Sequence, residues 1–263
     1  MTAVPLPTEI AESQPSTPRE SYLSQSRRPL AAAAIVVPLA IAYEVGTRLF
    51  HVDPTFATET RVLAFVWLRD VLTPGAPGGV NAAWLVPAAA VVALLAWHVF
   101  AGHSWRLRPT VPAGMACEAF VLALPLLALA LVAGNAHHFG LAAATSARDV
   151  AGDLVLAAGA GVFEEFVFRL AGFAVLHALL APALGERLAL ATTLVATSLA
   201  FAGYHHLPAT GEPFAWPAFA FRTAAGAWLG IVFLVRGFGL SVGCHAAHNT
   251  LVAVLPLLLT ATK

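Results

Sequence analysis

Charged residues are scarce in this sequence, and their scarcity is its most informative compositional feature. Only 11% of the 263 residues are Asp, Glu, Lys or Arg, whereas 59% are hydrophobic and the mean hydropathy is +0.79. About a quarter of the residues of a soluble domain are charged. A chain this poor in charge cannot cover a water-facing surface, so the composition predicts a protein that is embedded in lipid.

Cysteine is also nearly absent, and neither sign of charge is in excess. The two cysteines, Cys117 and Cys244, both lie in apolar stretches, which excludes a disulfide framework and a cysteine-based zinc site. The formal net charge is zero, so no nucleic-acid partner is expected. Residues 1–28 contain few apolar side chains and are rich in Ser and Pro, which predicts a disordered tail rather than a cleaved signal peptide.

Long apolar runs, in contrast, are plentiful after the tail. Because roughly 20 apolar residues cross a bilayer, the sequence predicts about seven transmembrane helices, near residues 30–48, 82–101, 116–134, 150–181, 187–206, 214–235 and 239–260. The mixed segment ETRVLAFVWLRDVL, which lies between the first two helices, is either an interfacial amphipathic helix or one more short membrane segment. The predicted fold class is therefore an all-α polytopic transmembrane bundle of seven to eight helices with a catalytic cavity inside the membrane.

The distribution of Lys and Arg gives a modest preference for one orientation. With the N-terminus in the cytoplasm, the tail arginines fall inside with Arg106, Arg108, Arg187 and Arg236, while Arg48, Arg61, Arg69, Arg148 and Lys263 fall outside. The cysteine-poor, alanine-rich composition favours a bacterial host. The expected location is therefore the inner membrane of a bacterium.

Three acidic and basic residues interrupt the fourth predicted helix. An ionisable side chain at the centre of a membrane helix costs about 2.5 to 3.5 kcal/mol on insertion scales, yet the run GVFEEFVFRLAG contains Glu164, Glu165 and Arg169. Glu165 and Arg169 are four residues apart and can pair. Glu164 points about 100° away, which leaves it available as a general base. The alternative is a buried ion pair with one spare hydrogen-bonding carboxyl group.

Two later helices carry imidazole and amide groups at helical spacing. Phe201 and His205 share a face of the fifth helix, and His245 and Asn249 share a face of the seventh. Without a catalytic role, His205 would be a residue at the membrane interface. The polar residues of the seventh helix would then form hydrogen bonds between helices. His206 and His248 lie on other faces of these helices.

Brought together, these groups are sufficient for peptide hydrolysis. A carboxylate can deprotonate water, a histidine can help to hold that water, and a histidine with an amide can stabilise the developing oxyanion. Other polar residues inside the predicted helices have simpler interpretations. Asp153 is most consistent with a carboxylate at a helix start, and Arg222 either snorkels or faces the cavity.

At these residues the chain resembles the CPBP family, which comprises the CAAX prenyl endopeptidases and their bacterial relatives of the Abi group. The pattern of the family is two adjacent glutamates with an arginine four residues later, a phenylalanine with a histidine four later, and a histidine with an asparagine four later. The resemblance covers about residues 115–260, so residues 115–263 are expected to form the protease core. Residues 29–114 are expected to form N-terminal transmembrane helices and an interfacial segment.

The resemblance implies an intramembrane endopeptidase that acts on a membrane-anchored protein or peptide within the lipid bilayer. It implies that Glu164 activates the water with help from His205, and that His245 and Asn249 form the oxyanion hole. Glu165 and Arg169 would orient and balance these groups, and Phe201 completes the motif.

The sequence leaves alternatives open for both the cofactor and the class of function. Glu164, His205 and His245 could hold a divalent metal such as zinc with an open fourth position, or the same residues could work without a metal. A transporter that relays protons is a second function class, and it predicts helices broken by Gly or Pro at mid-membrane and often an internal repeat. Neither feature is clear in the sequence, although Gly159 and Gly161 lie just before the glutamates. A non-catalytic immunity or scaffold protein is a third class.

Overall fold

The computed structural model describes residues 20–50, 52–53, 58–72, 85–132, 147–207 and 212–261. Its elements, in chain order, are α1 (Tyr22–Ser26), α2 (Pro29–Phe50), β1 (Val52–Asp53), β2 (Thr58–Glu59), α3 (Leu63–Leu72), α4 (Leu85–Phe100), α5 (Thr110–Val132), α6 (Ala147–Glu165), the π-helical turn η3 (Phe166–Ala171), α7 (Gly172–Leu184), α8 (Glu186–Tyr204), α9 (Trp216–Arg236) and α10 (Phe238–Ala261). The two short strands pair in an antiparallel manner.

The structure confirms a polytopic all-helical bundle. Six helical segments among the described residues are long and apolar enough to cross a membrane: α2, α5, the segment from α6 through α7, α8, α9 and α10. The predicted helix near residues 82–101 forms as α4, but its 16 residues make it shorter than a full span. Many large apolar side chains point outward, as expected for helices that face lipid, and Phe100 and Val132 are 90% and 87% exposed.

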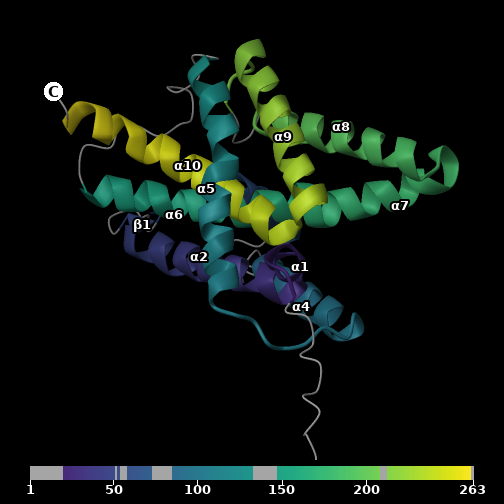
Figure 1. Cartoon of the computed structure of the whole chain (residues 1–263). Helices are drawn as coiled ribbons and strands as arrows, with labels where there is room; N and C mark the ends of the chain where they lie inside the picture. The colour runs from purple at the N-terminus through teal and green to yellow at the C-terminus, as the bar shows by residue number, and fades with distance from the viewer. Residues whose placement is uncertain are drawn as a thin grey trace, which may run out of the picture.

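The fourth predicted helix is the longest element of the fold. Figure 1 shows α6 and α7 running end to end through η3, with α8 returning beside α7. Single glycines make the sharp reversals from α7 to α8 and from α9 to α10. Gly185 and Gly237 have φ angles of 75° and 91°, a conformation that costs least for glycine. These reversals place the ends of α8 and α10 against the same part of the long helix.

Close packing of α2 and α10 against α6 depends on small residues in front of the two glutamates. A Cβ atom at Gly159 would lie 2.3 Å from ring carbons of Tyr43 in α2, and one at Gly161 would lie 2.9 Å from the Val242 carbonyl oxygen in α10. Helix α6 runs unbroken through both glycines. They are therefore sites of helix–helix approach, and not the helix break that a transporter predicts.

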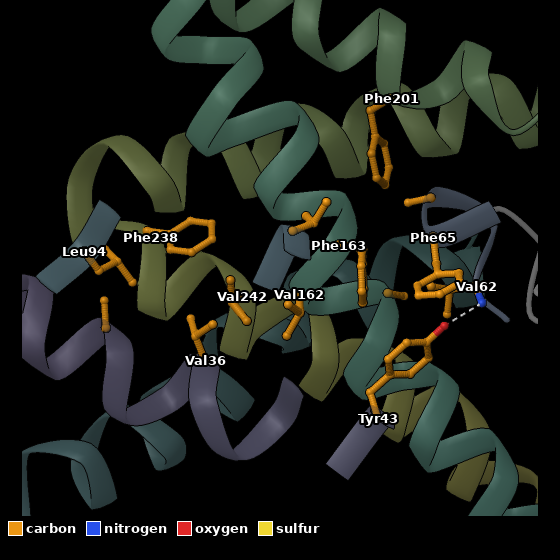
Figure 2. Packing of buried hydrophobic residues seen from close by; sticks show 14 of the residues in the cluster. Val36, Tyr43, Val62, Phe65, Leu94, Val162, Phe163, Phe201, Phe238 and Val242 are labelled. Carbon is orange, nitrogen blue, oxygen red and sulfur yellow. Dashed lines mark hydrogen bonds between the residues drawn. The ribbon is translucent and has the colours of Figure 1, made fainter. Parts of the chain in front are cut away.

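An aromatic cluster fixes the end of α6 that carries the glutamates. Phe163 packs edge-to-face against Tyr43 and Phe65, with ring centroids 5.3 Å apart in both pairs. Figure 2 shows these rings together, with the Val62 backbone N–H donating to the Tyr43 hydroxyl at 3.1 Å. Because Phe163 is fully buried, the next residue, Glu164, has a well-defined direction.

The mixed segment between the first two predicted helices forms the short helix α3. Its ten residues would extend about 15 Å, which is too short to cross a bilayer of about 30 Å. Phe65 attaches it to the core beside α6. The interfacial interpretation therefore fits, and α3 does not add a crossing to the bundle.

The predicted disordered tail is wrong for its last part. Residues 20–28 include α1, in which Gln25 and Ser26 are buried. The Tyr22 hydroxyl donates to Glu118 of α5 at 2.5 Å, and Arg236 of α9 donates to both Glu118 and Ser26. These long-range polar contacts, which sequence composition cannot reveal, hold α1 on the bundle. Residues 1–19 lie outside the described residues.

Candidate active site

The two adjacent glutamates end α6, and the helix then changes its winding. Residues Phe166–Ala171 form the π-helical turn η3, in which the Gly172 N–H bonds to the Val167 carbonyl group. A Cβ atom at Gly172 would lie only 2.6 Å from that carbonyl oxygen, which explains a glycine at this position. Single π turns inside long helices are frequently found at functional sites.

Glu165 is the centre of a buried polar network. Its Oε1 atom lies 3.2 Å from Arg169 NH1, which confirms the predicted pairing, and accepts a hydrogen bond from His245 Nδ1 at 2.8 Å. Its Oε2 atom interacts with the Ser241 hydroxyl at 2.5 Å. All four residues are at least 95% buried. A buried charge is tolerated only when it is paired and hydrogen-bonded, and this network meets that condition.

Arg169 connects this network to α8 and α9. Its NH2 group donates to the Gly226 carbonyl oxygen at 2.9 Å, and its guanidinium lies over the Phe201 ring, 4.7 Å from the centroid. The Phe201 ring also contacts the His245 ring at a centroid distance of 5.8 Å. Phe201 therefore acts as a packing platform between the arginine and both motif histidines.

Glu164 faces the other way, into a cavity of about 230 Å³ that we call the polar cavity. Its Oε2 atom lies 3.7 Å from Nε2 of His245, so the single imidazole ring stands between the two glutamates. The polar residues that line this cavity are Asp153, Glu164, His205, Glu212, Arg222, His245, His248 and Asn249. The four predicted catalytic residues therefore lie around one space, although they come from three separate helical segments.

His205 follows directly after the end of α8 and has a defined tautomer. Its Nδ1 atom lies 2.8 Å from the Phe201 carbonyl oxygen, and since a carbonyl only accepts, Nδ1 carries the proton. Burial, assisted by the positive charge of Arg222, lowers the pKa of His205 to about 3. The neutral ring therefore keeps Nε2 as a hydrogen-bond acceptor, which is the form needed to hold a water molecule.

Comparison with known families agrees with this geometry. Residues 147–251 match the model of the type II CAAX prenyl endopeptidase family, described as Rce1-like. This match supports a relation of the region to the CPBP/CAAX protease family. No curated protein and no solved structure shows a significant match to the chain. The seven motif residues from Glu164 to Asn249 all lie within the matched region.

The rest of the fold packs against the matched region. Helix α2 lies outside that region but packs against α6 and α10. Helix α2 and the matched region therefore form one packed body around the site.

Several residues of the site have no signal in the motif spacing. Ser241 lies four residues before His245 in an apolar run, and the buried Tyr204 hydroxyl lies beside Glu164. Asp153 lines the polar cavity instead of starting a helix, because α6 begins at Ala147. Arg222 faces the cavity, as one of the two alternatives had it. His248 also lines the cavity wall, although its offset from His245 placed it on another face.

The described side chains do not fit a metal centre. Within the part of the chain that the structure describes, no three His, Cys, Asp or Glu side chains form a group that could hold a metal ion. No catalytic step is therefore derived through a metal.

Proposed function

We propose that the chain is an intramembrane endopeptidase in which Glu164 activates a water molecule for attack on a peptide carbonyl group. The observation that carries this proposal is the polar cavity itself, in which Glu164 lies 3.7 Å from His245 and shares the space with His205 and Asn249. A water molecule that donates one proton to Glu164 can donate the other to Nε2 of His205. This arrangement supports general base catalysis, which is worth roughly 10² to 10⁴ in rate.

His245 and Asn249 are proposed to donate to the oxyanion. Because Nδ1 of His245 already donates to Glu165, Nε2 can donate only when both ring nitrogens carry protons. The ring stands between two carboxylates, because Nε2 lies 3.7 Å from Glu164 and Nδ1 lies 2.8 Å from Glu165. Glu165, with Arg169 and Ser241 beside it, would then act as the group that orients His245, as carboxylates orient histidines in other hydrolases.

The proposed reaction balances without any further reactant. The water oxygen bonds to the carbonyl carbon while its proton passes to Glu164, and the carbonyl oxygen becomes an oxyanion held by His245 and Asn249. Collapse of this intermediate breaks the carbon–nitrogen bond, and Glu164 returns the proton to the leaving amine. The products are a carboxylic acid and an amine.

The proposed substrate is a membrane-anchored protein or peptide. The cavity lies within helices that span the bilayer by length and composition, so a peptide must reach it from the membrane or its surface. The matched family is named for prenylated CAAX substrates. A prenylated CAAX peptide and its unprenylated form are therefore the first pair to compare.

The proposed location is the inner membrane of a bacterium, with the N-terminus in the cytoplasm. The arginine distribution supports this orientation. Helix α1 and Arg236, which the orientation puts on the cytoplasmic side, contact each other through Ser26.

The proposal is tested by reconstituting purified protein in liposomes with a membrane-anchored peptide and identifying products by mass spectrometry. Glu164→Gln should lower the cleavage rate by at least about a hundredfold, while Glu186→Gln, at a largely exposed carboxylate, should cleave like wild type. Cleavage by Glu164→Gln at the wild-type rate would disprove the role of this residue. Incubation with a chelator should leave wild-type activity intact, and loss that added zinc restores would show metal dependence.

A further inference from the structure

Arg222 brings a buried guanidinium to the polar cavity, whereas Arg169 pairs with Glu165 and does not line that cavity. It projects from α9, is 6% exposed, and lines the cavity together with Glu164 and His205. Its charge also contributes to the electrostatics of His205. The catalytic scheme above does not use Arg222, so its presence in this space needs a separate explanation.

Only part of the guanidinium is used within the protein. The NH2 group donates to both carboxylate oxygens of Glu212, at 2.9 and 2.8 Å. Among the described residues NH1 has no hydrogen-bond partner, although it is buried. A buried donor without a partner costs about 1 to 3 kcal/mol. The guanidinium therefore retains hydrogen-bonding capacity at the wall of the cavity.

Glu212 holds Arg222 from the edge of the cavity. Its side chain is 43% exposed, whereas that of Arg222 is 7% exposed. Its backbone is fixed beside the site, because the Glu212 N–H donates to the His205 carbonyl oxygen at 2.8 Å. The carboxylate can therefore turn toward solvent without any movement of the backbone that adjoins His205.

We propose that Arg222 binds a carboxylate group of the substrate, and that Glu212 occupies this position while the enzyme is empty. The inference rests on the proposed function and adds the chemistry that the site recognises. A buried guanidinium needs an anionic partner, and replacing Glu212 by a substrate carboxylate leaves the charge of the cavity unchanged. The planar fork of an arginine matches a carboxylate through two parallel hydrogen bonds, which would also use NH1.

The exchange has a consequence for where the enzyme cuts. Arg222, Glu164 and His245 share one cavity of about 230 Å³, so the bound carboxylate and the scissile carbonyl group must be close in the substrate sequence. Either a C-terminal carboxylate or an acidic side chain next to the cleavage site supplies this chemistry. The two sources differ in whether amidation of the C-terminus removes binding.

The test measures binding rather than cleavage, on the Glu164→Gln background in detergent or nanodiscs. Three fluorescent membrane-anchored peptides are compared: one with a free C-terminus, one amidated, and one amidated with Asp near its end. Arg222→Gln should weaken binding of carboxylate-bearing peptides about tenfold to a hundredfold and leave the peptide without a carboxylate unchanged. Arg187→Gln, at an exposed arginine of α8, is the matched control and should change none of them.

Glu212→Gln is the second variant and removes the competitor while it keeps Arg222. It should bind carboxylate-bearing peptides more tightly than the background protein. Equal binding of all three peptides by the background protein, equal loss of all three peptides in Arg222→Gln, or weaker binding of the carboxylate-bearing peptides in Glu212→Gln would each overturn the inference. Absence of Glu164-dependent cleavage would disprove the proposed function instead, and the preference for a carboxylate is measured independently of it.

Discussion

Ser241 shows how a single hydroxyl group can position His245, the proposed catalytic histidine, through a second residue. It interacts with the Glu165 Oε2 atom and with the Leu229 carbonyl oxygen at 3.0 Å, and Glu165 in turn holds His245. A serine has one proton, so it can donate to only one of these oxygens at a time. Its hydroxyl therefore connects the orientation of Glu165 to the backbone of α9.

We predict that Ser241→Ala lowers kcat about tenfold or more without a comparable change in KM. The physical reason is the loss of one hydrogen bond to a charged group, which is worth about 1.5 to 3 kcal/mol. Ser198→Ala is the control, because the buried Ser198 hydroxyl bonds only its own helix, at the Leu194 carbonyl oxygen. Steady-state kinetics measure kcat and KM of both variants. An equal decrease of kcat in the two variants would assign Ser241 a packing role.

The protonation of His205 gives a second prediction at this scale. Its pKa is lowered to about 3 by burial in the folded state, whereas an unfolded histidine has a pKa of about 6.5. As the pH falls below 6.5, the His205 side chain of the unfolded chain binds a proton, whereas that of the folded protein stays neutral. The contribution of this residue to the free energy of unfolding is therefore fully present above pH 6.5 and decreases toward pH 3. The melting temperature in detergent should fall less between pH 7 and 4 in His205→Gln than in wild type. An equal decrease of the melting temperature in the two proteins would contradict the lowered pKa of His205.

At the scale of elements, the approach of α2 and α10 to α6 depends on residues without side chains. A Cβ atom at Gly159 would meet the fully buried Tyr43 ring at 2.3 Å. The same helices hold the site, because Tyr43 packs on Phe163, which precedes Glu164. Tight packing at these glycines therefore acts on both stability and site geometry.

Gly159→Ala should destabilise the protein by about 1 to 3 kcal/mol, the usual cost of overpacking. Gly203→Ala is its matched control, since a Cβ atom there meets no described atom within 4 Å. Alanine in a helix interior gains up to about 1 kcal/mol over glycine. Thermal unfolding followed by size-exclusion chromatography in detergent should therefore move the two variants in opposite directions. A Gly159→Ala protein as stable as wild type would show that the helices adapt.

The number of membrane crossings decides the arrangement of the whole molecule. Among the described residues six segments reach the length of a span, and α4 has 16 mostly apolar residues. At 1.5 Å per residue α4 is about 24 Å long, close enough to the bilayer core for local thinning to accommodate it. If α4 crosses, seven crossings put the two ends of the chain on opposite sides.

We predict that the N-terminus is cytoplasmic and that the end of the chain at Lys263 lies on the opposite side. Fusions of a reporter that works only outside the cytoplasm, compared with one that works only inside, measure this at both ends. Activity of the external reporter after Lys263 supports seven crossings. Internal reporter activity at both ends would instead give α4 an interfacial position and leave six crossings.

The sequence by itself determined that the protein is a helical membrane protein and where most of its helices run, and it supplied the residues that are proposed to carry its chemistry. These features follow from local causes: apolar runs of membrane length, and residues four apart that share a helix face, such as Glu165 and Arg169. Only the tertiary structure decided that Ser241 and Arg222 join the site, and that α1 packs on the bundle. Such residues meet across long stretches of chain, because single-glycine reversals at Gly185 and Gly237 and close packing at Gly159 set how the helices cross. No local pattern in the sequence encodes those crossings.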